Sequence, residues 1–253
     1  MQVYPNIVKS KPPIVSTVLA RGSYAYVGIL HGHPSTVLKW PAIRDPHTLE
    51  CFETEKRAFE LLSQHQHIVN YLWANETGIC LEYCAWGPIR YHYGCHGLPD
   101  INGRLLWCHQ AISAVAHLHS KGLVHCDIST RNCLLAENLD VKLCDFGATV
   151  RAGEFMHGVA ELHYGGARRP QDSLACISYD LFCMGGLLYE IIGGKQPFGD
   201  LDRFDAMQKY LQEVYPSLDG IDPQYARVIQ NCWSGKYNTA EELGNDLPIP
   251  DII

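Results

Sequence analysis

The sequence predicts an α+β fold with two lobes: a small β-rich N-terminal lobe that carries one helix, and a larger, mainly helical C-terminal lobe. Short strand patterns separated by turn residues fill positions 14–82, whereas helical patterns of apolar residues dominate positions 89–247. The chain of 253 residues is long enough for two lobes that share a cleft. We therefore expect an irregular lead-in over 1–13, one domain over 14–253, and a hinge over 83–88.

The N-terminal lobe is predicted to contain three strands, a helix and two further strands. β-branched and aromatic residues fill the strand segments, and glycine-containing turns separate the first three. Asp45 before Pro46 marks the start of the helix, because a proline in the first turn lacks only a donor that the helix cannot use. Trp86, Gly87 and Pro88 interrupt the pattern at the hinge. The expected strands cover 14–19, 25–30, 36–40, 68–73 and 78–83.

The C-terminal lobe is predicted to contain four helices and a hairpin. Leu105, Cys108, Ile112 and Val115 follow the spacing of an amphipathic helix that ends near Gly122. A hairpin, a second and very apolar helix, and two capped helices come after it. The hairpin joins 133–136 to 141–144, the apolar helix carries Leu181, Met184, Leu188 and Ile191, and the last two helices start at Asp222 and at a capping box formed by Thr239 and Glu242.

Composition and charge argue against several classes of function. The net charge is −7 and no block of lysine and arginine is present, so we expect neither nucleic acid nor an anionic membrane surface as a partner. The eleven cysteines include no Cys-x-x-Cys pair, which favours reduced thiols over disulfides or a zinc site. The sequence has no apolar run of 18 residues and no signal-peptide pattern. We expect a protein without a membrane span, in the cytoplasm or, alternatively, the nucleus.

The most specific signal is an ordered set of polar residues after the long helix. His125, Asp127 and Asn132 form the pattern H-x-D-x(4)-N, and Asp145 opens an Asp-Phe-Gly triplet after the predicted hairpin. Each aspartate or asparagine alone is commonly a turn residue. Together they supply a carboxylate that can orient a substrate hydroxyl, and an amide and a carboxylate that can hold Mg²⁺ on phosphates. Over about residues 15–243 the chain resembles a protein kinase catalytic domain.

The resemblance implies a kinase that uses ATP and Mg²⁺ and phosphorylates a protein. Asp127 would be the catalytic base, and Asn132 and Asp145 would bind the metal. Two alternatives stay open: a pseudokinase that serves as a nucleotide-binding or scaffold module with weak or no catalysis, and a small-molecule phosphotransferase. A scaffold has no chemical need for these three residues together with Lys39, which argues against the pseudokinase.

Three further catalytic positions follow from the resemblance. Lys39, at the end of the third strand, would reach the α- and β-phosphates and would be held by Glu55 in the next helix. Glu53 is the alternative partner of this lysine. Arg131 resembles the catalytic-loop arginine of tyrosine kinases and of tyrosine-kinase-like serine/threonine kinases, whereas Ser129 stands where serine/threonine kinases usually carry lysine. The following segment lacks the tryptophan-containing substrate loop of tyrosine kinases, so we expect a serine/threonine kinase.

The resemblance also implies a nucleotide site between the lobes. Leu81 would be the gatekeeper behind the adenine, and Glu82 and Cys84 would present backbone groups to it. Aliphatic side chains would sandwich the ring, and the turn between the first two strands would cover the phosphates. The expected nucleotide-binding residues are Ala20, Gly22, Ala25, Val27, Val37, Lys39, Leu81, Glu82, Cys84 and Leu134.

Structural positions of the family are matched as well. His125 and Phe146 would stack with Phe59 to link the lobes, and Asp180 would anchor the backbone of the catalytic loop. A buried ion pair, in contrast, is expected to be missing: Gln171 replaces its glutamate, and Tyr237 and Asn238 stand where the family has the arginine and the proline that follows it. Losing one partner of a buried pair costs about 3–5 kcal/mol, whereas losing both can be nearly neutral. We therefore expect a stable fold with a less firmly held substrate-facing loop.

Two departures bear on activity and its control. Only Gly22 matches the glycine pattern of the phosphate loop, and Ala20 and Ala25 replace its neighbours, so we expect weakened but not abolished ATP binding. Cys126 replaces the arginine that precedes the catalytic aspartate in many kinases, where it receives an activating phosphate. We expect activity that does not depend on phosphorylation of hydroxyls after the Asp-Phe-Gly triplet. The candidate hydroxyls belong to Thr149, Tyr164 and Ser173.

Overall fold

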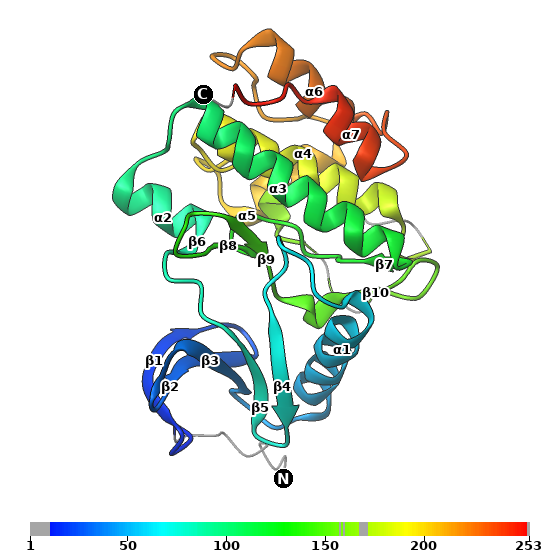
Figure 1. Ribbon diagram of the computed structural model, residues 1–253. Coiled ribbons are helices and arrows are strands. Elements are labelled where there is room, and N and C mark those ends of the chain that lie inside the picture. The colour runs from blue at the N-terminus through cyan, green and yellow to red at the C-terminus, as the bar shows by residue number, and fades with distance from the viewer. Residues whose placement is uncertain (1–10, 157, 159, 167–171, 252–253) are drawn as a thin grey trace.

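The structure is a computed structural model that describes residues 11–156, 158, 160–166 and 172–251. Within these residues the chain forms a β-rich N-terminal lobe with one long helix and a mainly helical C-terminal lobe, which confirms the predicted α+β fold class (Figure 1). Most of the predicted lead-in lies outside the described residues. The predicted domain limits therefore stay a prediction.

A five-stranded antiparallel sheet forms most of the N-terminal lobe. Its order is β1-β2-β3-β5-β4, so β3 lies at the centre, between β2 and β5. Helix α1 (Pro46–Leu62) begins as predicted at Asp45, whose carboxylate accepts a hydrogen bond from the backbone N–H of Thr48 at 2.8 Å. The strands are β1 (Val15–Arg21), β2 (Ala25–Leu30), β3 (His33–Pro41), β4 (Tyr71–Asn75) and β5 (Gly78–Glu82).

Strand β4 begins later than the sequence pattern predicts. The backbone N–H of Val69 donates to the carbonyl of Leu143 at 3.0 Å, and the N–H of Leu143 donates to the carbonyl of His67 at 2.8 Å. Ile68 forms a parallel bridge with the same leucine. Residues 67–69 therefore pair with the C-terminal lobe rather than with β5, and the predicted strand start at position 68 is wrong. Their backbone bonds link the two lobes.

A small three-stranded sheet lies directly after the crossing between the lobes. Gly87 and Pro88, which the sequence places in the hinge, form strand β6 (Gly87–Pro88) and pair with Leu135 and Leu134. The hairpin expected from the sequence supplies the other two strands, β8 (Cys133–Leu135) and β9 (Val141–Leu143). Two helices that no sequence pattern predicted follow later: α2 (Ile89–His96) and α5 (Arg203–Leu211).

Helices α3 and α4 form the centre of the C-terminal lobe, and α6 and α7 cover its far end (Figure 1). Helix α4 is buried over nearly its whole length, as its apolar sequence predicts, and it carries two buried acids, Asp180 and Glu190. No helix in the described part of the chain combines the length and apolar character needed to cross a bilayer. The remaining elements are α3 (Ile101–Ser120), β7 (Leu123–Val124), η1 (Phe146–Ala148), β10 (Val150–Arg151), η2 (Leu162–Tyr164), α4 (Ile177–Gly193), α6 (Pro223–Trp233) and α7 (Ala240–Asp246).

One buried apolar cluster continues from the N-terminal lobe into the C-terminal lobe. At its centre, the ring of Phe59 on α1 lies 5.0 Å from the ring of Phe146, which in turn lies 5.2 Å from the ring of His125. These three residues form the stack that the sequence predicts. Because such ring contacts add to the burial of apolar area, the stack holds α1 against the Asp-Phe-Gly segment and so fixes the position of Glu55 on the same helix.

Candidate active site

A lysine from the sheet meets two carboxylates from different parts of the chain. Lys39 Nζ lies 2.7 Å from Glu55 Oε2 and 2.8 Å from Asp145 Oδ1. Glu55 is buried, with 2% of its side chain exposed, whereas Glu53 is exposed, so the structure decides between the two candidate partners in favour of Glu55. The site therefore combines β3, α1 and the Asp-Phe-Gly triplet.

The charged forms of Lys39 and Asp145 stabilise each other, whereas burial raises the pKa of Glu55. Burial disfavours the ammonium group of Lys39, but the carboxylates of Asp145 and Glu55 outweigh this effect and raise its pKa well above the usual range. In turn, Lys39 holds the pKa of Asp145 below its usual range. Asp145 is 47% exposed, so its charged carboxylate lies at the accessible side of the cluster.

Asp180, on helix α4, holds the backbone of the catalytic loop in place. Its carboxylate accepts hydrogen bonds from the N–H groups of His125 at 2.7 Å and Cys126 at 2.9 Å. Cys126 has φ of 67°, a left-handed conformation that is unfavourable for a residue with a side chain. The two bonds to a fully buried carboxylate hold the loop in this shape, which is the anchoring role expected for Asp180.

Asp127 projects from the loop with one oxygen bonded and one unbonded. Its Oδ2 accepts hydrogen bonds from Asn132 Nδ2 at 2.9 Å and from Arg131 Nη2 at 3.2 Å. Among the described residues, its buried Oδ1 has no hydrogen-bond partner. Burial raises the pKa of Asp127 to about 6, against the opposing effect of Arg131 and His125. A carboxylate with such a free oxygen can orient and accept the proton of a hydroxyl group.

The donor set fits Mg²⁺ bound together with a nucleotide. Proteins usually hold Mg²⁺ by one or two carboxylates plus substrate phosphates. Asp145 offers an accessible carboxylate, and Asn132, whose amide nitrogen donates to Asp127 Oδ2, offers its amide oxygen. In the part of the chain that the structure describes, no group of three histidine, cysteine or acidic residues gathers as a separate metal site.

The predicted adenine-site residues lie on neighbouring strands. Val27 pairs with Lys39, and Val37 pairs with Leu81, so these side chains share the central part of the sheet. The Glu82 carboxylate accepts the N–H of Asn70 at 2.9 Å, and the N–H of Glu82 donates to the Asn70 carbonyl at 3.0 Å, so both groups are engaged within the protein. Of the other predicted residues, Cys84 is buried and Leu134 half-buried.

The predicted phosphate-loop residues differ in exposure. Ala20 and Gly22 are exposed, whereas Ala25 lies at the buried start of β2 with 6% exposure. The N–H of Gly22 donates to the carbonyl of Ala25 at 2.7 Å and closes the turn. A Cβ on Gly22 would lie 3.6 Å from that carbonyl oxygen, which is an ordinary contact. The turn therefore does not require glycine in this conformation.

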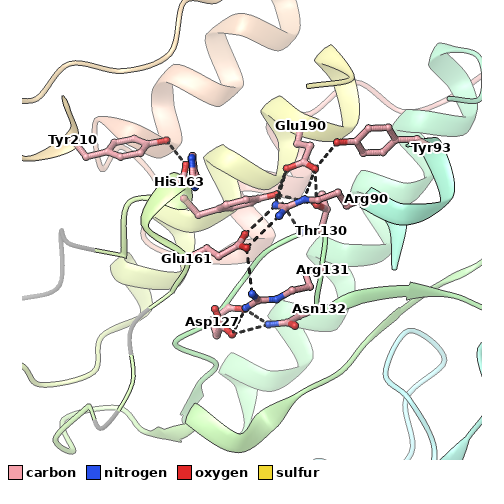
Figure 2. A network of polar contacts seen from close by, with 11 residues as sticks. Arg90, Tyr93, Asp127, Thr130, Arg131, Asn132, Glu161, His163, Glu190 and Tyr210 are labelled. Atoms are coloured by element: carbon pink, nitrogen blue, oxygen red, sulfur yellow. Dashed lines mark hydrogen bonds and ion pairs between the residues drawn. The ribbon is translucent and has the colours of Figure 1, made fainter. Parts of the chain in front are cut away.

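A network of charged residues that the sequence did not reveal lies beside the catalytic loop (Figure 2). Arg131 binds Asp127 and also Glu161, with Nη1 at 3.2 Å from Glu161 Oε1. Arg90 on α2 binds Glu161 at 3.0 Å and the buried Glu190 at 2.9 Å. A glutamate inside the apolar run of α4 is the one sequence signal that could have indicated this network.

The hydroxyls proposed as phosphorylation candidates are all buried. Thr149 is 4% exposed, Ser173 is 9% exposed, and Tyr164 is fully buried with its hydroxyl donating to Glu190. A kinase could reach them only after local opening of the structure. Of the ion pair expected to be missing, Gln171 lies outside the described residues. On the side of the arginine, Tyr237 is buried and its hydroxyl donates to Asp246 Oδ2 at 2.5 Å, and Asn238 is exposed, with its N–H bonded to Glu242 at 2.7 Å.

Comparison with known proteins settles the family. The family model described as "protein tyrosine and serine/threonine kinase" matches residues 36–242. This chain belongs to that family. The match covers the kinase domain from β3 into α7, and it includes Lys39, Asp127, Asn132 and Asp145. The expected resemblance to a protein kinase catalytic domain is thereby confirmed.

Relatives of the kinase domain come from distant organisms. The chain is 30% identical over 208 residues to the serine/threonine-protein kinase meng-po of Drosophila melanogaster, which covers 74% of this chain and 44% of the relative. It is 28% identical to the serine/threonine-protein kinase RUNKEL of Arabidopsis thaliana, over 78% of this chain and 16% of the relative. For PrkC of Bacillus subtilis the identity is 24%, over 83% of this chain and 35% of the relative. The aligned part is thus less than half of each of these relatives.

Proposed function

We propose that this chain is an active kinase domain that transfers the γ-phosphate of Mg²⁺-ATP to a serine or threonine hydroxyl of a protein. The observation that carries the proposal is the contact of Lys39 with both Glu55 and Asp145, at 2.7 and 2.8 Å. This contact requires α1, β3 and the Asp-Phe-Gly triplet to be assembled together. Phosphoryl transfer by kinases needs this ion pair and the aspartate in place at the same time.

Each polar residue of the site has a distinct task in this proposal. Lys39, oriented by Glu55, binds the phosphates of the nucleotide. Asn132 and Asp145 would hold Mg²⁺, which when bound neutralises the charge that develops on the phosphates. The carboxylate of Asp127 would orient the substrate hydroxyl and take its proton.

A serine or threonine acceptor is supported by two observations. The three relatives reported above, from an insect, a plant and a bacterium, are all named serine/threonine-protein kinases. The segment between η2 and α4 also lacks the tryptophan expected of a tyrosine kinase substrate loop. Acid hydrolysis of the phosphorylated product, followed by separation of phosphoserine, phosphothreonine and phosphotyrosine, tests this choice.

Transfer of labelled phosphate separates the proposal from its alternatives. Purified protein is incubated with Mg²⁺, labelled ATP and a general protein substrate, beside the Asp127→Asn variant. We expect incorporation by the wild type and a loss of at least about 100-fold in the variant, since the proton acceptor is gone. Equal incorporation in both, or none in either, would leave a pseudokinase, and label found only on small molecules would indicate the other phosphotransferase class.

We also propose an intracellular location, in the cytoplasm or the nucleus. All eleven cysteines are free, and seven of them are buried. Buried reduced thiols are typical of proteins that work in a reducing compartment. Microscopy of the natural full-length protein carrying a fluorescent tag tests the proposal, and a signal confined to a secretory compartment would contradict it.

A further inference from the structure

Glu161 is held by two arginines that come from different parts of the C-terminal lobe. Arg90 on α2 contacts both of its oxygens, with Nη2 at 3.0 Å from Oε2 and Nη1 at 3.2 Å from Oε1. Arg131 on the catalytic loop contacts Oε1 at 3.2 Å. Charge-assisted bonds of this forked kind fix direction as well as distance. The carboxylate of Glu161 is therefore one point at which α2 and the catalytic loop meet (Figure 2).

Arg131 transmits this constraint to the catalytic base. Its Nη2 lies 3.2 Å from Asp127 Oδ2, while its Nη1 lies on Glu161. The guanidinium thus bridges two carboxylates and engages Oδ2 of Asp127, the oxygen that also accepts from Asn132. Because Arg131 is 50% exposed, its contact with Asp127 alone is a weak surface pair four residues apart. The second carboxylate is what keeps the long side chain in one orientation.

Arg90, one of the two arginines that bind Glu161, is itself held in place by a buried carboxylate. Arg90 Nε lies 2.9 Å from Glu190 Oε1, and Glu190 is fully buried in α4. Tyr93 and Thr130 also donate to the Glu190 carboxylate, at 2.7 and 2.9 Å. Since Thr130 directly precedes Arg131, the network reaches the catalytic loop by two routes, through Glu161 and through Glu190.

We propose that Glu161 is a positioning residue, which orients Arg131 and through it the carboxylate of Asp127, and so attaches the segment before η2 to the catalytic loop. The proposal rests on the kinase function proposed above. The charge of Glu161 is permanent, and the nearby hydroxyls of Tyr164 and Thr149 are buried, so the attachment needs no phosphorylation. This gives a physical basis for activity without the arginine that Cys126 replaces.

Removing only the charge of Glu161 should alter the chemical step rather than nucleotide binding. In Glu161→Gln, Arg131 loses its second carboxylate and becomes free to turn both nitrogens toward Asp127. The unbonded Oδ1 of Asp127 is then engaged by the arginine. Lys39, Glu55 and Asp145 do not contact Glu161 and keep their arrangement. We expect kcat to fall about 10- to 100-fold while KM for ATP stays within about twofold.

The test compares three variants by kinetics and by hydrogen–deuterium exchange. Glu161→Gln removes the charge and Glu161→Asp keeps it. Glu154→Gln is the matched control, because Glu154 is exposed in the same segment and its side chain accepts only the N–H of Arg151 in the contacts described. We expect faster exchange at 127–132 and 160–166 in Glu161→Gln alone, and partial recovery of kcat in Glu161→Asp.

Two results would overturn the proposal. One is wild-type kcat together with unchanged exchange in Glu161→Gln. The other is an equal loss of kcat and of melting temperature in both Glu161→Gln and Glu161→Asp, which would indicate a structural role only. If the wild type shows no phosphotransfer, the proposed kinase function has failed, but the exchange experiment still tests the positioning role. Unchanged exchange in Glu161→Gln refutes this role, and faster exchange at 127–132 supports it.

Discussion

Replacing Asp180 with alanine should destabilise the chain strongly, although Asp180 touches neither nucleotide nor substrate. Its fully buried carboxylate accepts the N–H groups of His125 and Cys126, at 2.7 and 2.9 Å. Both amides would lose their acceptor inside the core, and a buried unsatisfied donor costs about 1–3 kcal/mol. For the two amides we therefore expect a loss of about 4 kcal/mol, which is large beside the usual 5–15 kcal/mol of a domain.

Equilibrium unfolding in urea, followed by tryptophan fluorescence, measures this loss. Asp180→Asn retains one oxygen acceptor, so its loss should be about half as large. Asp219→Ala is the control, because Asp219 is exposed and binds only the nearby Ser217 among the contacts described, and its change should stay within about 0.5 kcal/mol. A loss below about 1 kcal/mol in Asp180→Ala would refute the idea that this carboxylate holds the left-handed Cys126 in place.

Three other outcomes are expected. Burial, followed by the charge of His117, lowers the pKa of His65 from 6.5 to about 4, so its contribution to stability is present above pH 6.5 and is lost as the pH falls toward 4. The free energies of unfolding from urea titrations at pH 7.5 and 5 should differ by about 1 kcal/mol more in the wild type than in His65→Asn, a value reduced for solvent screening. Gly22→Ala should change unfolding by less than about 0.5 kcal/mol. Gly28→Ala should cost about 1–3 kcal/mol in the same assay, since its Cβ would meet the Thr17 carbonyl at 2.6 Å; equal effects of the two glycine variants would contradict this reasoning.

Most of the fold and of the candidate site residues could be predicted from short sequence patterns. The helix cap at Asp45, the hairpin at 133–144 and the apolar helix around Leu188 each depend on short-range patterns, and all are present in the structure. The choice between Glu53 and Glu55 was not settled by the sequence. It needed the sheet and α1 in their packed positions, where Glu55 alone is buried against Lys39.

Long-range contacts explain what the sequence did not show. Arg90 lies 71 positions from Glu161 and 100 from Glu190, and no local pattern connects residues so far apart. Helix α2 carries mixed histidines and aromatic residues and begins after Pro88 without a side-chain cap, so its start gives no signal. Helix α5, in contrast, has a cap at Asp202, which accepts the N–H of Phe204 at 2.7 Å, and could have been found from that residue.

Nucleotide binding through Lys39 is one test of the proposal that this chain is an active kinase. Lys39→Met leaves the buried Glu55 without its cation, and we expect the stabilisation by Mg²⁺-ATP in a thermal-shift assay to disappear. Persistent stabilisation in this variant would show that Lys39 does not bind the phosphates.

The most direct measurement is transfer of the γ-phosphate itself. With Mg²⁺ and labelled ATP, the wild type should phosphorylate serine or threonine in a protein substrate, and Asp127→Asn should lose at least about 100-fold in rate while still binding nucleotide. Omission of Mg²⁺ should abolish transfer as well. Wild-type protein that binds Mg²⁺-ATP but transfers no phosphate, or an Asp127→Asn variant as active as the wild type, would contradict the assignment of Asp127 as the base of an active kinase.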